Sequence, residues 1–184
     1  MPDAAIDACC LIDLLASGHA EAILRASAFT WRLPSAVRGE VQYLRQHDPT
    51  QPGQVVKVPA DLSGLIASGV LTVCDPENQQ ELDLFTHYAA VFRSDGEAMC
   101  LAIAGQRAWV VATDDRKAIR VAQQAGLSVV SCPALVKAWA DVTSPDQVTL
   151  KKVLQDIEVL AQFKPNPSMP EHRWWDDQLS PTHP

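Results

Sequence analysis

Short apolar runs alternate with helical patterns through the first 140 residues, and this alternation most constrains the fold. The runs lack the every-second-residue polarity of a half-exposed strand, which is typical of strands covered on both faces. Because connections that contain whole helices join parallel strands, the sequence predicts an α/β fold, a three-layer α/β/α arrangement with a short central parallel sheet. Strands are expected at residues 4–7, 29–33, 70–74, 108–112 and 127–131.

Helical patterns fill the connections between these runs. Glycines after apolar stretches are expected to end several of the helices, because glycine adopts the left-handed conformation that follows a last turn. A loop is expected over residues 47–53, which are rich in polar residues, Pro and Gly. Helices are expected over residues 8–17, 21–28, 35–45, 60–68, 77–92, 94–105, 116–126 and 133–140.

The chain changes character after residue 140. Ser144-Pro145-Asp146-Gln147 has the pattern of a capping box with Pro at the first helical position, which predicts a helix to about residue 162. Residues 163–184 hold five of the thirteen prolines, so they are expected to form an extended tail. Trp174 and Trp175 in that tail are expected to pack on the chain's own domain, with anchoring of a partner as the alternative. We therefore divide the chain into a domain (1–140), a C-terminal helix (141–162) and a Pro-rich tail (163–184).

Composition excludes some classes of protein. A net charge of −7 argues against coating nucleic acid through overall charge, although an enzyme that binds a metal before a phosphate remains compatible with it. Five cysteines, an odd number without a C-x-x-C pair, predict reduced thiols in a cytoplasmic protein. No apolar run is long enough to span a membrane, and Asp7 and Asp13 interrupt the only early apolar stretch, which does not fit a signal peptide.

Four acidic residues stand at the ends of predicted elements: Asp7, Glu40, Glu97 and Asp115. Three of them follow or open a junction between sheet and helix, and such junctions share one edge of a parallel sheet. Clustered carboxylates repel one another unless protons or cations lie among them, and hard divalent cations prefer oxygen ligands. The pattern predicts a metal-binding acidic pocket at that edge.

Each acid also has a purely structural interpretation. Ser94-x-x-Glu97 is itself a capping box, and Asp114 and Asp115 suit the first turn of a helix. Asp95 competes with Glu97 for the third position of the pocket, and Asp114 competes with Asp115 for the fourth. A single pocket accounts for all of these acids together.

Four segments hold these acids: I-D-A-C-C-L-I-D-L-L-A-S-G, P-S-A-V-R-G-E-V, S-D-G-E-A-M-C-L-A-I-A and V-V-A-T-D-D-R-K-A-I-R. They resemble, in order, the acidic motifs of PIN domains, and the resemblance spans about residues 4–140. It implies a Mg²⁺- or Mn²⁺-dependent ribonuclease, often the VapC-like toxin of a toxin–antitoxin pair, that leaves a 5′-phosphate and a 3′-hydroxyl. It implies RNA as substrate and an antitoxin protein as partner, and it leaves a homodimer open. The metal ligands implied are Asp7, Glu40, Glu97 and Asp115.

Residues around these acids complete the expected site. Thr113 is the small polar neighbour of the last acid, and it is expected to contact substrate together with Arg116 and Lys117, the two best placed basic residues. Ala8 and Cys9 stand where the family usually has Thr or Ser and then Asn or Ser. Two alternatives remain: a catalytically silent PIN-like domain that acts as a protein or RNA interaction module, and, more weakly, a receiver-like or phosphatase domain with an Asp nucleophile.

Overall fold

The central sheet has five parallel strands in the order β5-β2-β1-β6-β7, as seen in a computed structural model that describes residues 1–180. Strand β1 is central, with β2 on one side and β6 on the other. The predicted α/β fold with a parallel sheet is confirmed. In sheet order the strands are β5 (Leu71–Cys74), β2 (Thr30–Pro34), β1 (Asp3–Ile6), β6 (Val110–Ala112) and β7 (Val129–Val130).

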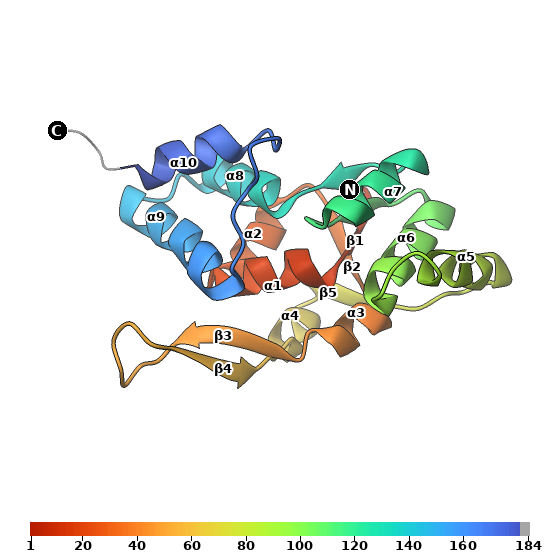
Figure 1. Ribbon diagram of the computed structural model, residues 1–184, viewed down its shortest axis with the longest axis horizontal. Helices are drawn as coiled ribbons and strands as arrows, with labels where there is room; N and C mark the ends of the chain where they lie inside the picture. Colours follow the sequence, from red (N-terminus) through yellow and green to blue (C-terminus); the bar gives the residue numbers. More distant parts are fainter. Residues whose placement is uncertain (181–184) are drawn as a thin grey trace.

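Helices cover both faces of this sheet. Helices α1, α2 and α8 contact one another, and α6 contacts α3, α5 and α7, so the sheet lies between two helical layers (Figure 1). A short helix, α4, precedes β5. The bounds are α1 (Ala8–Ala16), α2 (Ala20–Ala26), α3 (Ser35–Glu40), α4 (Ser63–Ala67), α5 (Gln79–Ala89), α6 (Asp95–Arg107), α7 (Arg116–Gln124) and α8 (Cys132–Thr143).

Helix α6 is the helix that lies directly on the central strands. It contacts β1, β2 and β6, and seven of its thirteen residues are buried. The Cys100 thiol donates a hydrogen bond to the carbonyl of Ile6, the last residue of β1, at 3.4 Å. This contact fixes the start of α6 near the carboxyl end of β1, where the sequence placed the acids.

The predicted helix over residues 35–45 is wrong in its second half. Helix α3 ends at Glu40, and β3 (Tyr43–His47) pairs antiparallel with β4 (Val55–Pro59) to form a hairpin that projects from the body (Figure 1). The apolar spacing of Val37, Val41 and Leu44 suits a helix locally. A strand partner more than ten residues away provides a full hydrogen-bond ladder instead, and the predicted loop is the turn of this hairpin.

The C-terminal extension differs from its prediction in two ways. Helix α9 (Gln147–Asp156) starts at Asp146, which accepts a hydrogen bond from the Thr149 amide, whereas Ser144 ends α8 in the left-handed conformation. After the π-helix η1 (Ile157–Ala161), the tail contains α10 (His172–Leu179), so an entirely extended tail is wrong. The last four residues of the predicted tail, 181–184, lie outside the described residues.

The tryptophan pair packs on its own chain, as expected. Trp175 is fully buried, and its indole N–H donates to Glu158 Oε1 at 3.1 Å. The Phe163 ring meets Trp175 edge-on at 6.5 Å between centroids. Truncation of a buried aromatic side chain to Ala costs about 3–5 kcal/mol, so these contacts hold α10 within the extension. The extension contacts the domain through η1, which packs on α1 and β3.

Two further findings concern membrane-spanning helices and cysteine thiols. None of the helices within residues 1–180 is long and apolar enough to cross a membrane. All five cysteines are free thiols, and three of them, Cys10, Cys100 and Cys132, are buried.

Candidate functional site

The carboxyl edge of the two central strands brings two of the predicted acids together. Ile6 of β1 pairs in register with Ala112 of β6, and the Asp7 amide donates to the Ala112 carbonyl at 2.9 Å. Asp7 then caps α1, and Asp115 caps α7 by accepting hydrogen bonds from the first-turn amides of that helix. Each acid therefore caps a helix and also lies at the shared edge of the sheet; for Asp115 the sequence had suggested a structural role in the first turn, and for Asp7 it had suggested none.

Helix α6 adds Glu97 to this edge. Glu97 lies one turn before Cys100, whose thiol contacts the end of β1. Burial, followed by the charges of Asp7 and Asp115, raises the pKa of Glu97 to about 7, and the Glu40 charge contributes in the same direction. Glu97 is therefore close enough to the other three acids to feel their charges. Among residues 1–180, the four carboxylates do not form a group whose ligand atoms all lie within 4.8 Å of one another.

Glu40 reaches the group by capping α6 from outside that helix. Its Oε1 accepts hydrogen bonds from Ser94 Oγ at 2.6 Å and from the Gly96 amide at 2.8 Å. The Ser94 hydroxyl therefore donates to Glu40 and makes no capping hydrogen bond to α6, so the predicted capping box with Glu97 does not form. This approach requires glycine, because a Cβ on Gly96 would lie 2.6 Å from Glu40 Oε2.

Three donors hold the Asp7 carboxylate. The Ala8 amide donates at 2.6 Å, the Thr113 hydroxyl at 2.9 Å and the Cys9 thiol at 3.2 Å. Asp7 is 2% exposed, and burial raises its pKa despite these hydrogen bonds. Cys9 therefore gives Asp7 a polar partner at a position where the PIN-domain pattern usually has Asn or Ser.

Thr113 is not placed to contact a substrate, contrary to the sequence prediction. Its side chain is fully buried, and its hydroxyl lies between Asp7 Oδ2 and the Asp115 amide, which donates to it at 3.2 Å. The hydroxyl links the two acids, so Thr113 acts as a positioning residue.

A second acidic group lies deeper. Asp13, Asp114 and Cys132 each offer a ligand atom, and these atoms lie within 4.8 Å of one another. Burial raises the pKa of Asp13 to about 8 and that of Asp114 to about 7, although Asp114 also accepts two hydrogen bonds from the Cys132 amide. Sequence analysis overlooked Asp13 as a site residue; its signal was an acid inside the apolar run L-I-D-L-L.

An open cavity of about 340 Å³ lies between members of the two groups, although Asp7, Glu40 and Cys132 are not among the residues that line it. Glu97, Asp114 and Asp115 line it together with Asp13 and Cys9, and the C-terminal extension closes one side through residues 161–163. Exposed Asp95, the alternative to Glu97, is not among the residues that line it within 1–180.

The predicted acids have no basic ion-pair partner among the described residues. Within residues 1–180, no ion pair joins a Lys, Arg or His to Asp7, Glu40, Glu97, Asp114 or Asp115. Lys117 donates to the Val91 carbonyl and lies over the Phe92 ring, 5.2 Å from its centroid. Arg116 is exposed and lines a neighbouring cavity. Because the protein supplies no positive charge among these carboxylates, they suit a cation.

Comparisons with known proteins do not identify the chain further: no protein-family model, curated protein or solved structure matches it.

Proposed function

We propose that this chain is a Mg²⁺- or Mn²⁺-dependent ribonuclease that hydrolyses RNA phosphodiester bonds at the acidic cluster. The observation that carries the proposal is the placement of Asp7 and Asp115 on either side of the Thr113 hydroxyl, at the edge where Glu40 caps the helix that bears Glu97. None of these acids has a basic ion-pair partner among the described residues. The resemblance to PIN-domain motifs supports the same reaction and the same four residues.

The donor set fits a hard divalent cation. All four acids offer carboxylate oxygens, which Mg²⁺ and Mn²⁺ prefer, whereas the deeper group includes the soft, fully buried Cys132 thiol. Burial and mutual repulsion raise the pKa values of Asp7 and Glu97, and a nearby cation would relieve that repulsion. A cation bound by these acids supplies a polarised water as nucleophile and offsets negative charge on the phosphate.

The chain's own residues fix the geometry of this site. Three donors orient Asp7, and two donors from the start of α6 orient Glu40. The cap on α7 fixes Asp115. Such fixed carboxylates need little rearrangement before the reaction. Arg116, exposed directly after Asp115, can hold an RNA phosphate beside them.

The test is Mg²⁺-dependent cleavage of RNA by the wild type and by Asp7→Asn. We expect the substitution to abolish cleavage, because it removes a ligand charge while keeping the side-chain shape. Asp95→Asn is the matched control, since it removes an exposed acid on α6, and it should cleave like the wild type. Full activity of Asp7→Asn would overturn the proposal.

Metal titration separates this function from a silent interaction module. Mn²⁺ should bind a saturable site, and Asp115→Asn should lose that site while remaining folded, because Asn also caps helices well. Absence of any saturable Mn²⁺ site in the wild type would favour the interaction module instead.

The proposal extends to a cytoplasmic toxin held inactive by an antitoxin. The free thiols agree with a reducing compartment, and the unpaired acids offer a place for a partner's Arg side chain. Co-expression with the small protein of a neighbouring reading frame should block RNA cleavage, and a pair that cleaves unhindered would refute this extension.

A further inference from the structure

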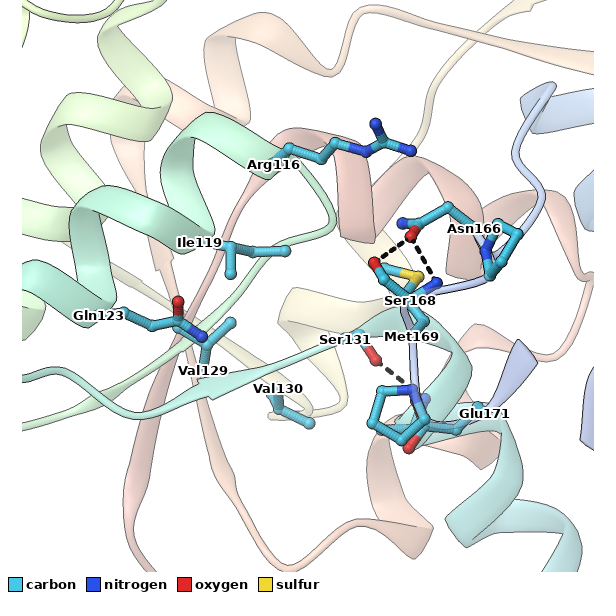
Figure 2. A pocket seen from close by; sticks show the side chains of 13 residues that line it. Arg116, Ile119, Gln123, Val129, Val130, Ser131, Asn166, Ser168, Met169 and Glu171 are labelled. Atoms are coloured by element: carbon cyan, nitrogen blue, oxygen red, sulfur yellow. Dashed lines mark hydrogen bonds between the residues drawn. The ribbon is translucent and has the colours of Figure 1, made fainter. Parts of the chain in front are cut away.

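A cavity of about 770 Å³ lies beside the acidic site and is formed by both the domain and the C-terminal extension (Figure 2). Helix α7, strand β7 and the start of α8 supply one side, and residues 166–171 supply the other. Asn166 Oδ1 accepts hydrogen bonds from the Ser168 amide and hydroxyl, which holds the second side in a turn. Both walls of the cavity are therefore held by ordered structure, and the cavity has room for more than one nucleobase.

The two ends of this cavity differ in charge. Arg116, the residue after Asp115, lies at one end, and Glu171 lies toward the other (Figure 2). Glu171 Oε2 is buried and has no hydrogen-bond partner among residues 1–180. A buried acceptor without a donor is unfavourable, so rotation of the Glu171 side chain toward a ligand in the cavity that brings N–H or O–H groups would relieve this cost.

We propose that this cavity binds a guanine nucleotide of the RNA substrate, with Arg116 on its phosphate and Glu171 on the Watson–Crick edge of its base. The inference rests on the proposed ribonuclease function and adds a substrate specificity to it. The neighbouring acids support the placement, because a phosphate held by Arg116 lies directly beside the Asp115 end of the acidic cluster.

Guanine fits the carboxylate better than the other bases do. Its N1–H and N2–H₂ groups are adjacent donors, and a carboxylate offers two acceptors side by side. Adenine and cytosine place a ring-nitrogen acceptor next to their amino group, and uracil places its single N–H between two carbonyls, so each would set an acceptor against Glu171. Apolar side chains on both sides, Ile119 and Val129 from the domain and Met169 from the tail, suit the flat faces of a base.

Binding of 5′-GMP, AMP, CMP and UMP to the full chain in EDTA tests this inference without cleavage. We expect saturable GMP binding at least about tenfold tighter than that of the other three, since one bidentate base contact is worth about ten- to a hundredfold. Glu171→Gln should lower GMP affinity by a similar factor, because its amide donors would face guanine donors. Equal binding of the four nucleotides, or unchanged GMP affinity in folded Glu171→Gln, overturns the inference.

Arg116→Ala provides a second variant at an exposed position, where folding is secure. It should weaken GMP binding and leave guanosine binding unchanged, because only the phosphate contact is lost; equal effects on both ligands would contradict the assigned orientation. Guanine-selective binding in a chain that never cleaves RNA would reject the ribonuclease and keep the guanine site. Metal-dependent cleavage without guanine preference in binding would reject the guanine site and keep the ribonuclease.

Discussion

Replacing Gly96 by Ala tests whether Glu40 belongs to the metal site. A Cβ at this position would lie 2.6 Å from Glu40 Oε2 and 2.9 Å from its Cδ. The carboxylate must recede by about 0.8 Å before ordinary van der Waals contact at 3.4 Å is restored. Because the obstructing group is the end of an exposed, flexible side chain, we expect Glu40 to move and the fold to remain.

The effect on stability should be small, because two contributions oppose each other. Alanine in a helix stabilises by about 0.5–1 kcal/mol relative to glycine. Loss of the hydrogen bonds from Ser94 and Gly96 to Glu40 removes up to about 1.5–3 kcal/mol, reduced by solvent because Glu40 is exposed. The free energy of unfolding should therefore change by only about 1 kcal/mol. Cleavage should fall far more, by about 10- to 100-fold, because a displacement of nearly 1 Å disturbs a preorganised ligand.

The control is Gly105→Ala in the same helix. Its Cβ would meet only Leu84 Cδ1 at 3.8 Å, an ordinary contact, so this variant should gain about 0.5–1 kcal/mol and keep full activity. Urea denaturation, Mn²⁺ titration and cleavage rates of both variants provide the comparison. If Gly96→Ala binds Mn²⁺ and cleaves RNA like Gly105→Ala, Glu40 is not a ligand and our reasoning about the start of α6 fails.

Three further changes are predicted. The pKa of Asp13 is raised to about 8 from an ordinary 3.8, so the stability that this group contributes is full below pH 4 and declines toward pH 8, by at most about 1.4 kcal/mol per pH unit. The urea midpoint of Asp13→Asn, measured in EDTA, should therefore rise relative to that of the wild type as pH rises. A constant difference between the two midpoints would contradict this. Ala108→Gly should raise the free energy of unfolding by about 0.5–1 kcal/mol, because Ala108 ends α6 at φ 53, and thermal denaturation showing a loss would count against left-handed strain there. Cys9→Ser should keep cleavage within a few-fold and Cys9→Ala should lower it about tenfold, since only serine still donates to Asp7; equal rates for the two would remove the assigned role.

Local patterns were enough to predict the sheet because each parallel strand is a short, mostly apolar segment that is followed by its own helix, although β2 also holds Thr30 and Arg32. They failed for β3, since its hairpin partner lies beyond the turn and the spacing of Val37, Val41 and Leu44 equally suits a helix. They failed for α10 as well. Its prolines, at 165, 167 and 170, all precede the helix and therefore do not interrupt it.

The site residues likewise divide into those set by local sequence and those that depend on distant parts of the chain. Asp7 and Asp115 were predictable because residues in the junction between a parallel strand and its following helix emerge at the shared edge: Asp7 directly follows β1, and Asp115 is the N-cap of the helix after β6. Glu171 was not, because its surroundings exist only after the tail folds back onto the domain, and nothing in the adjacent sequence specifies that docking. The contacts that join the extension to the domain include those of η1 with α1 and β3 and that of the Lys137 ammonium with the Trp174 ring.

The extension has a consequence for how activity and selectivity are divided within the chain. Residues 161–163 line the acidic cavity and residues 166–171 line the neighbouring one, so the tail supplies walls to both. The four acids all come from the first 140 residues. If the proposed ribonuclease function holds, these acids would act on any phosphodiester that reaches them, and the choice among RNA sequences would depend on the tail. Substitutions within 166–171 should then change which bond is cut with little effect on metal affinity.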